Sequence, residues 1–249
     1  MKRNLKLTIA YDGTRYNGFQ RLGDTKNTIQ EKLETCISRF LNEDIKVIGA
    51  SRTDAGVHAF EQIINFYTNS DIDLIELRDK LNFYLPEDIV VTSVEEAPIN
   101  FHSRYWVVRK TYLYRIYTSP IPPLFERNYV YNLGKKLDVD RMKAASKLFI
   151  GEKNFQAFSK RTGKKDTVRT IYDIEIIETD KEVNIYVTGN SFLYNMVRII
   201  VGTLIEVGLH EREFDTIIKA FETGDRTLSG FTAPPEGLFL YKNYFTVKK

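Results

Sequence analysis

The chain has 249 residues with a net charge of +3, and its 43% hydrophobic and 28% charged residues are typical of a folded globular protein, which excludes a disordered one. A single cysteine, Cys36, excludes an intramolecular disulfide and any metal site built from several cysteines. Residues 1–10 lack the apolar segment of a secretory signal, and no apolar run is long enough to cross a bilayer, so we expect a soluble, cytoplasmic protein with no membrane partner.

The first part of the chain alternates between strand and helix patterns. Apolar and polar residues alternate over 5–9, which predicts a strand that ends at a turn, Asp12-Gly13. The sequence Thr28-Ile29-Gln30-Glu31 is typical of a capping box at the start of a helix, and Cys36 lies on the apolar stripe that follows, where we expect it to be a core residue. Further strands are predicted over 46–50, 62–68 and 89–94, and a second helix over 73–82.

The second part repeats these patterns. Asp138 is expected to cap a helix that ends near Gly151. Strands are predicted over 112–117, 129–133, 169–178, 183–189 and 239–247, and helices over 194–207 and 212–222. Each part therefore has the order strand-helix-strand-strand-helix-strand. We predict an α+β fold in which two similar halves, residues 1–102 and 103–249, are joined in one mostly antiparallel sheet with helices on one face and a central basic cleft.

The charges are unevenly distributed between the two halves. Residues 1–97 contain 12 Lys and Arg against 16 Asp and Glu, a net charge of −4, whereas the remainder contains 24 against 17, a net charge of +7. Two basic segments, 104–115 and 160–169, contribute to this excess, and the first also contains Tyr and Trp. The pattern is typical of a surface that binds a polyanion such as nucleic acid, and it is equally compatible with two solvated surface strands.

Several common catalytic motifs are absent from the sequence. It contains no phosphate-binding loop of the G-x-x-x-x-G-K-[ST] type and no G-x-G-x-x-G dinucleotide fingerprint after a strand. The three histidines are far apart and lack the spacing of zinc ligands, so we expect no metal site.

The segment from Ala50 to Ala59 contains the clearest candidate for chemistry. Asp54 lies between two predicted strands on a turn of small residues, with Arg52 two positions before it and Gly56 two positions after it. Glycine lets the chain turn back sharply, and a nearby guanidinium would keep a carboxylate ionised in a cleft. Taken alone, the same residues also describe a turn aspartate that bonds its own backbone beside a surface arginine.

The run Arg52-Thr53-Asp54-Ala55-Gly56-Val57-His58-Ala59 resembles the signature of the tRNA pseudouridine synthase A family. Further matching stretches, in the same order, are Tyr11-Asp12-Gly13 with Gly18-Phe19-Gln20-Arg21, Arg109-Lys110-Thr111-Tyr112, Met196-Val197-Arg198 with Val201-Gly202, and Glu236-Gly237-Leu238. The resemblance covers nearly the whole chain. The chain departs from the family where it has Phe19 in place of a frequent Trp and Ser51 in place of a common Gly.

The resemblance implies an enzyme that converts uridine to pseudouridine in the tRNA anticodon stem-loop, typically at positions 38, 39 and 40. It also implies two α+β halves in one antiparallel sheet, a homodimer, and no cofactor or metal. By the same resemblance Asp54 is the nucleophile, Arg198 is its ion-pair partner, and Tyr112 stacks on the flipped base. Arg52 and Arg21 lie in matching motifs and are expected to bind substrate.

The residues themselves support some of these roles and leave others open. A target uridine must leave its stack to reach a carboxylate, and an aromatic ring such as Tyr112 offers it a surface, although such a ring is also a common core residue. Arg198 lies in a predicted apolar helix, one turn before Gly202, where the missing side chain lets another backbone come close. The Arg198 guanidinium is either paired with an acid or extends to the surface from the end of the helix. Lys164 and Lys165, in the second basic segment, are expected to contact the tRNA backbone, unless that segment is merely solvated.

Two other functions are compatible with the residues alone. A non-catalytic protein that binds structured RNA would not need the carboxylate of Asp54. A carboxylate-dependent nucleoside hydrolase would need a second acid, for which Glu61 is the nearby candidate in sequence.

Overall fold

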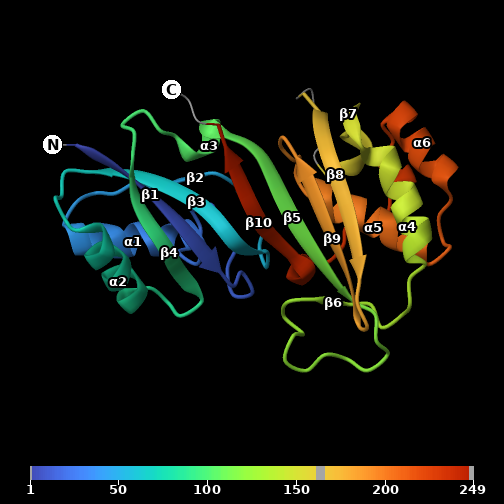
Figure 1. The fold of residues 1–249 in the computed structure, drawn as a ribbon, viewed down its shortest axis with the longest axis horizontal. Helices are drawn as coiled ribbons and strands as arrows, with labels where there is room; N and C mark the ends of the chain where they lie inside the picture. The colour runs from blue at the N-terminus through green and yellow to red at the C-terminus, as the bar shows by residue number, and fades with distance from the viewer. Residues whose placement is uncertain (1, 161–165, 247–249) are drawn as a thin grey trace. The chain divides into compact units, whose positions relative to one another are not determined.

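The computed structural model describes residues 2–160 and 166–246, and the chain divides into two compact units (Figure 1). Unit 1 comprises Met1–Val108 together with Phe239–Lys249, and unit 2 comprises Arg109–Leu238. A compact unit is not by itself a domain. The predicted division into domains 1–102 and 103–249 therefore stays a prediction.

Unit 1 is built on strand β1, which pairs antiparallel with β3 on one side and β4 on the other. The short strand β2 pairs antiparallel with β3, and β10 pairs parallel with β3 where Phe239 lies opposite His58. Helices α1 and α2 lie beside these strands (Figure 1). The elements of the unit are β1 (Arg3–Tyr11), α1 (Ile29–Leu41), β2 (Ile48–Gly49), β3 (His58–Thr68), α2 (Leu74–Tyr84), β4 (Ile89–Ala97), α3 (Ser103–Trp106) and β10 (Leu238–Phe245).

The start of α1 is set by the local sequence. The Thr28 hydroxyl accepts a hydrogen bond from the Glu31 N–H at 3.3 Å, so the predicted cap is confirmed. The second half of the predicted capping box is wrong, because the Glu31 carboxylate pairs instead with Arg21 at 2.6 Å. Cys36 is half-buried rather than a core residue, since the fully buried stripe of α1 consists of Ile29, Leu33 and Ile37.

Unit 2 is built on strand β9, which pairs antiparallel with β5 and with β8. Strand β7 pairs antiparallel with β8, and the two-residue β6 pairs parallel with β5. Helices α4, α5 and α6 lie together on one side of β8 and β9 (Figure 1). The elements are β5 (Val107–Tyr117), β6 (Tyr131–Asn132), α4 (Val139–Ser146), β7 (Gly151–Asn154), β8 (Val168–Glu178), β9 (Glu182–Gly189), α5 (Met196–Gly208) and α6 (Phe214–Thr223).

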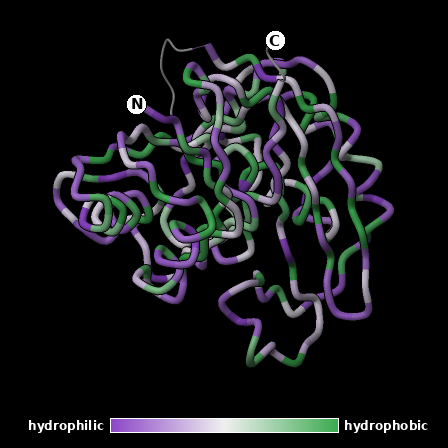
Figure 2. The backbone as a smooth tube through the Cα atoms, turned by 60° about the vertical axis from the view of Figure 1, so that its left-hand side comes forward, coloured by the Kyte–Doolittle hydropathy of each residue, from purple (hydrophilic) through white to green (hydrophobic). Residues whose placement is uncertain are grey.

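The core of unit 2 lies between these strands and the nearly wholly apolar helix α5, eleven of whose thirteen residues are buried. Buried and partly exposed residues alternate along β9, so its buried side chains share one face of the strand. Figure 2 shows hydrophilic and hydrophobic residues following one another along the backbone. Asp138 caps α4 as predicted, because its carboxylate accepts from the Arg141 N–H at 2.9 Å.

The α+β fold and the mostly antiparallel pairing are confirmed within each unit. The predicted strands over 46–50 and 129–133 are shorter than expected, at two residues each, and β7 and α3 were not predicted. In the part of the chain that the structure describes, no helix is long and apolar enough to span a membrane.

Candidate active site

The loop that carries Asp54 is fastened at its start by a buried glutamine of β3. The Gln62 side chain donates to the Ser51 carbonyl at 2.7 Å and accepts from the Ser51 N–H at 3.2 Å. Just before it, the Ala50 N–H donates to the Ile63 carbonyl at 2.8 Å. Because Gln62 is fully buried, these bonds are shielded from competing water and fix where the loop leaves the strand.

The residue next to Asp54 is held from two sides. The Thr53 and Tyr11 hydroxyls share a hydrogen bond at 2.8 Å, and the Thr53 carbonyl accepts from the Phe19 N–H at 3.1 Å. Tyr11, Phe19 and Thr53 are all buried. The backbone entering Asp54 is therefore anchored to β1 and to the segment that follows it.

Two glycines let this segment approach the loop closely. A Cβ atom on Gly18, whose φ is +94°, would lie 2.7 Å from the Thr53 carbonyl oxygen. A Cβ atom on Gly13 would lie 2.0 Å from the Val57 carbonyl oxygen. Both distances are shorter than real Cβ contacts, so only glycine allows this packing.

Asp54 itself is half-buried, and Arg52 is exposed on the same loop. The Val57 N–H donates to the Asp54 carbonyl at 3.2 Å, and Gly56 has a φ of +77°, as expected for a sharp turn. The loop is thus a fixed support that holds Asp54 at a partly exposed position. A nucleophile needs such a fixed position, whereas an ordinary surface carboxylate does not.

His58, the last but one residue of the signature, has a structural role. It is buried, its Nδ1 accepts from the Gly13 N–H at 3.1 Å, and its ring stacks on Phe239 at 4.7 Å between centroids. The imidazole therefore ties the end of the Asp54 loop to the segment after β1 and to β10.

Arg21 lies in the segment before α1, and its side chain contacts that helix. Its guanidinium pairs with Glu31 at 2.6 Å and with Glu34 at 3.2 Å, and half of its side chain is exposed. These two carboxylates already neutralise the Arg21 guanidinium. Its predicted role in substrate binding stays a prediction.

Two tyrosines of β5, Tyr112 and Tyr114, differ in their surroundings. Tyr112 is buried against Phe192, with the rings edge to face at 5.1 Å. Tyr114 is fully buried, and its hydroxyl donates to the Pro234 carbonyl at 2.8 Å. Burial, together with the nearby charge of Glu236, raises the pKa of Tyr114 well above its usual value, so this hydroxyl remains a donor. Tyr114 is a core residue, which leaves Tyr112 as the candidate for stacking.

Arg198 lies on α5 and is half-buried. Its Nε donates to the Ala233 carbonyl at 2.6 Å, and its backbone carbonyl accepts from the Ala233 N–H at 3.1 Å. The close approach expected at Gly202 is confirmed, because a Cβ atom there would lie 2.0 Å from the Phe231 carbonyl oxygen. The segment 226–233 thus runs directly along α5.

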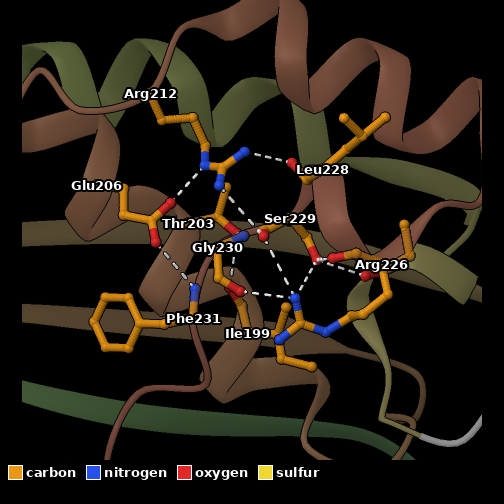
Figure 3. A network of polar contacts seen from close by, with 10 residues as sticks. Ile199, Thr203, Glu206, Arg212, Arg226, Leu228, Ser229, Gly230 and Phe231 are labelled. Carbon is orange, nitrogen blue, oxygen red and sulfur yellow. Dashed lines mark hydrogen bonds and ion pairs between the residues drawn. The ribbon is translucent and has the colours of Figure 1, made fainter.

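A polar network holds that segment in place (Figure 3). Glu206 of α5 accepts from the Arg212 Nε at 2.6 Å and from the Phe231 N–H at 3.1 Å. Arg212 also donates to the Leu228 and Ser229 carbonyls. The Thr203 hydroxyl accepts from the Gly230 N–H at 2.9 Å, so residues 228–231 are bonded either to α5 or to Arg212 beside it.

Arg226 completes the network from within the segment itself. Its guanidinium donates to the Ser229 hydroxyl at 2.8 Å and to the Gly230 carbonyl at 2.9 Å (Figure 3). No sequence pattern predicts this network as a whole. The one signal in the sequence is Glu206, a carboxylate in an apolar helix, which indicates a cationic partner.

The structure groups the predicted site residues by unit. Arg52, Asp54 and Arg21 lie in unit 1, whereas Tyr112 and Arg198 lie in unit 2. The pairing of Asp54 with Arg198 stays a prediction. Lys164 and Lys165 lie outside the described residues. Within the described ranges, no three His, Cys, Asp or Glu side chains gather as a metal-ligand set would.

Comparison with known proteins identifies the family. Residues 7–106 and 145–246 match the family described as tRNA pseudouridine synthase. The protein named tRNA pseudouridine synthase A 2 of Clostridium perfringens (strain 13 / Type A) is 46% identical over 244 residues, which are 98% of this chain and 100% of that protein. The protein named tRNA pseudouridine synthase A of Bacillus sp. (strain KSM-64) is 48% identical over 238 residues, 95% of this chain and 97% of that one.

A third relative, tRNA pseudouridine synthase A 2 of Clostridium tetani (strain Massachusetts / E88), is 45% identical over 98% of this chain and 100% of its own length. Among solved structures, a chain of a Cbf5-Nop10-Gar1 complex aligns with 95% of this chain and 48% of its own length, at 14% identity and a TM-score of 0.39, and adds nothing to the assignment. The sequence relatives and the family match together cover the segments that carry Asp54 and Arg198, and the chain belongs to the tRNA pseudouridine synthase family.

Proposed function

We propose that this protein is a tRNA pseudouridine synthase, an isomerase that converts uridine in tRNA to pseudouridine. The observation that carries the proposal is the match to proteins of that name over essentially their full lengths at 45–48% identity. The support of the loop adds to it, because the contacts of Tyr11, Gly13, Gly18 and Gln62 hold the chain on both sides of the half-buried Asp54.

The reaction needs little from the protein beyond a nucleophile and a site for the flipped base. The N1–C1′ bond breaks, the uracil rotates, and a C5–C1′ bond forms, while C5 loses a proton and N1 gains one. The product therefore has the mass of the substrate. The Asp54 carboxylate serves either by adding to C6 of the uracil or by trapping C1′ of the sugar, and it is released when the new bond forms.

The remaining roles follow from residue chemistry and family membership. Tyr112, edge to face with Phe192, stacks on the extruded base. Arg198 pairs with Asp54 and keeps it ionised. Arg52 is exposed beside Asp54 and is suited to a phosphate or a polar edge of the substrate, and Arg21, Lys164 and Lys165 add positive charge along the RNA.

We further propose the family's finer features for this chain. The two halves, residues 1–102 and 103–249, are joined in one mostly antiparallel sheet, and a central basic cleft receives the anticodon stem-loop, with positions 38, 39 and 40 as targets. The enzyme acts as a homodimer in the cytoplasm and needs neither a metal nor a cofactor.

The hydrolase alternative loses its candidate acid in this structure. Glu61, the nearby carboxylate in sequence, accepts from the Asn243 N–H at 3.2 Å, and the Asn243 side chain donates to the Glu61 carbonyl at 2.6 Å. Glu61 therefore helps to fasten β10 to β3. No observation favours the hydrolase or the non-catalytic protein over the synthase.

The test is to incubate the purified protein with unmodified tRNA transcripts and map pseudouridine by carbodiimide-dependent stops of primer extension. The expected result is new stops at uridines of the anticodon arm, with no change in the mass of the RNA. Release of free uracil, or no stops with any tRNA, would overturn the proposal.

A further inference from the structure

A groove of about 620 Å³ lies in unit 1, between α1 and the C-terminal end of α2. One wall is a helical stripe of α1, because Lys32, Cys36 and Arg39 follow each other at intervals of four and three residues. Tyr84 forms part of the opposite wall, and Lys26 reaches the groove from the segment before α1. The volume is in the range of known ligand sites, and none of these residues belongs to the Asp54 loop.

The groove is positively charged. Lys26, Lys32 and Arg39 line it together with one carboxylate, Glu31. That carboxylate is already paired with Arg21 at 2.6 Å, so it does not neutralise the lysines and the arginine of the groove. A site with this balance attracts an anion.

Aromatic rings stand beside these charges. Phe40 lines the groove, and the Lys80 ammonium lies 4.6 Å from the centre of its ring. Tyr84 is 65% exposed, and the neighbouring Phe83 is 80% exposed with its ring edge to face against that of Tyr84 at 5.0 Å. The two exposed rings lie together as one apolar patch rather than as scattered single residues, and such patches mark binding surfaces.

We propose that this groove binds a single-stranded stretch of the substrate RNA, with phosphates on Lys26, Lys32 and Arg39 and an unstacked base on Tyr84. Positive charge that follows a backbone, combined with exposed aromatic rings, is the arrangement by which proteins bind single-stranded nucleic acid without reading its sequence. The proposal rests on the proposed function for the identity of the RNA. It assigns to unit 1 an RNA contact separate from the residues that hold Asp54.

Cys36 gives a direct readout, because it is the only cysteine of the chain and it lines the groove. Burial raises the pKa of its thiol, so alkylation with iodoacetamide is best measured at about pH 8.5, where more thiolate is present. We expect saturating unmodified tRNA to slow the alkylation of Cys36 about tenfold, and an oligouridine of about eight nucleotides to slow it as well.

Variants separate RNA binding from other causes of protection. Lys32→Gln with Arg39→Gln should remove the protection and flatten the salt dependence of tRNA binding by about two units, one for each lost phosphate contact. Tyr84→Ala should raise the Kd for tRNA about tenfold. The matched controls are Lys46→Gln, which removes an exposed lysine outside the groove, and Ile75→Ala, which removes an exposed apolar side chain at the other end of α2. Both controls should behave as the wild type.

The same preparations are assayed for pseudouridine, which keeps the two proposals distinct. Isomerisation without protection of Cys36 would contradict RNA binding in the groove and would leave the proposed function standing. Protection that grows with protein concentration in the absence of RNA would show that a second copy of the chain covers the groove, and it would also overturn the proposal. Protection by tRNA that is lost in the paired Gln variant, but kept in both controls, would establish it even if no uridine were isomerised.

Discussion

Arg198 and Ala233 are bonded to each other twice. The Arg198 Nε donates to the Ala233 carbonyl at 2.6 Å, and the Ala233 N–H donates to the Arg198 carbonyl at 3.1 Å. One bond positions the guanidinium and the other positions the segment that accepts from it. The direction of the Arg198 side chain therefore depends on where the segment 226–233 lies along α5.

Replacing Arg198 tests its proposed pairing with Asp54. Arg198→Met keeps a side chain of similar length but removes the charge, so we expect kcat/KM to fall at least about 100-fold. The residual activity should also need a higher pH, because a carboxylate without its cation is ionised less readily. The measurement is kcat/KM against pH for both proteins. Near-normal turnover, with the acid limb of the pH profile at the same pH as in the wild type, would contradict the pairing of Arg198 with Asp54.

Glu206 is expected to act through the network of Figure 3. Its side chain and that of Arg212 are only 18% and 16% exposed, so Glu206→Gln should lower the free energy of unfolding by about 2 kcal/mol, since it leaves Arg212 without its counter-charge. The control is Glu213→Gln, which breaks the more exposed pair with Arg141 and should cost no more than about 0.5 kcal/mol. Urea denaturation measures both, and equal losses would contradict the role of the network.

Two glycines of the same segment provide a matched test of how the Asp54 loop is held. Gly18→Ala places a Cβ atom 2.7 Å from the Thr53 carbonyl oxygen at a φ of +94°, so it should cost about 2 kcal/mol of stability and lower kcat at least tenfold. Gly23→Ala meets no atom within 4 Å and should remain within about 0.5 kcal/mol of the wild type. Thermal unfolding and single-turnover rates give the two quantities. If Gly18→Ala is as active as Gly23→Ala, the close packing does not position Asp54.

The +7 charge of residues 98–249 predicts that tRNA binding weakens steeply with added salt. Each phosphate contact by Lys or Arg contributes a slope of roughly −0.7 to −0.9 in log K against log salt. Neutralising Lys164 and Lys165 together, as Lys164→Gln with Lys165→Gln, should flatten the slope by about one or two units. Filter binding at several salt concentrations measures it, and an unchanged slope would mean that these lysines do not touch the RNA.

Features set by residues close together in sequence could be predicted, and features set by distant contacts could not. The Asp138 cap is predictable because its bond to the Arg141 N–H spans only three residues. The partner of Glu31 is not, because Arg21 reaches that carboxylate from a loop before the helix. The partial exposure of Cys36 is not predictable either, because helical periodicity does not show how wide the buried stripe is.

The same distinction applies to the site. A turn at Gly56 and a close approach at Gly202 followed from residue type alone. Three other features cannot be predicted in this way, because each depends on the register of strands or on a loop that returns to a helix. They are the hydrogen bonds of Gln62 to Ser51, the bond between Tyr11 and Thr53, and the network around Glu206. The sequence alone indicates the residues proposed to carry chemistry, but not the residues that hold them in place.

Asp54 is proposed as the nucleophile of a tRNA-uridine isomerase, and the variant Asp54→Asn tests that role. The amide keeps the shape of the side chain but is a far poorer nucleophile, so the fold and the Kd for tRNA should stay as in the wild type. Single-turnover conversion of uridine to pseudouridine in an unmodified tRNA should fall below detection. Turnover by Asp54→Asn at more than a small fraction of the wild-type rate would contradict the assignment.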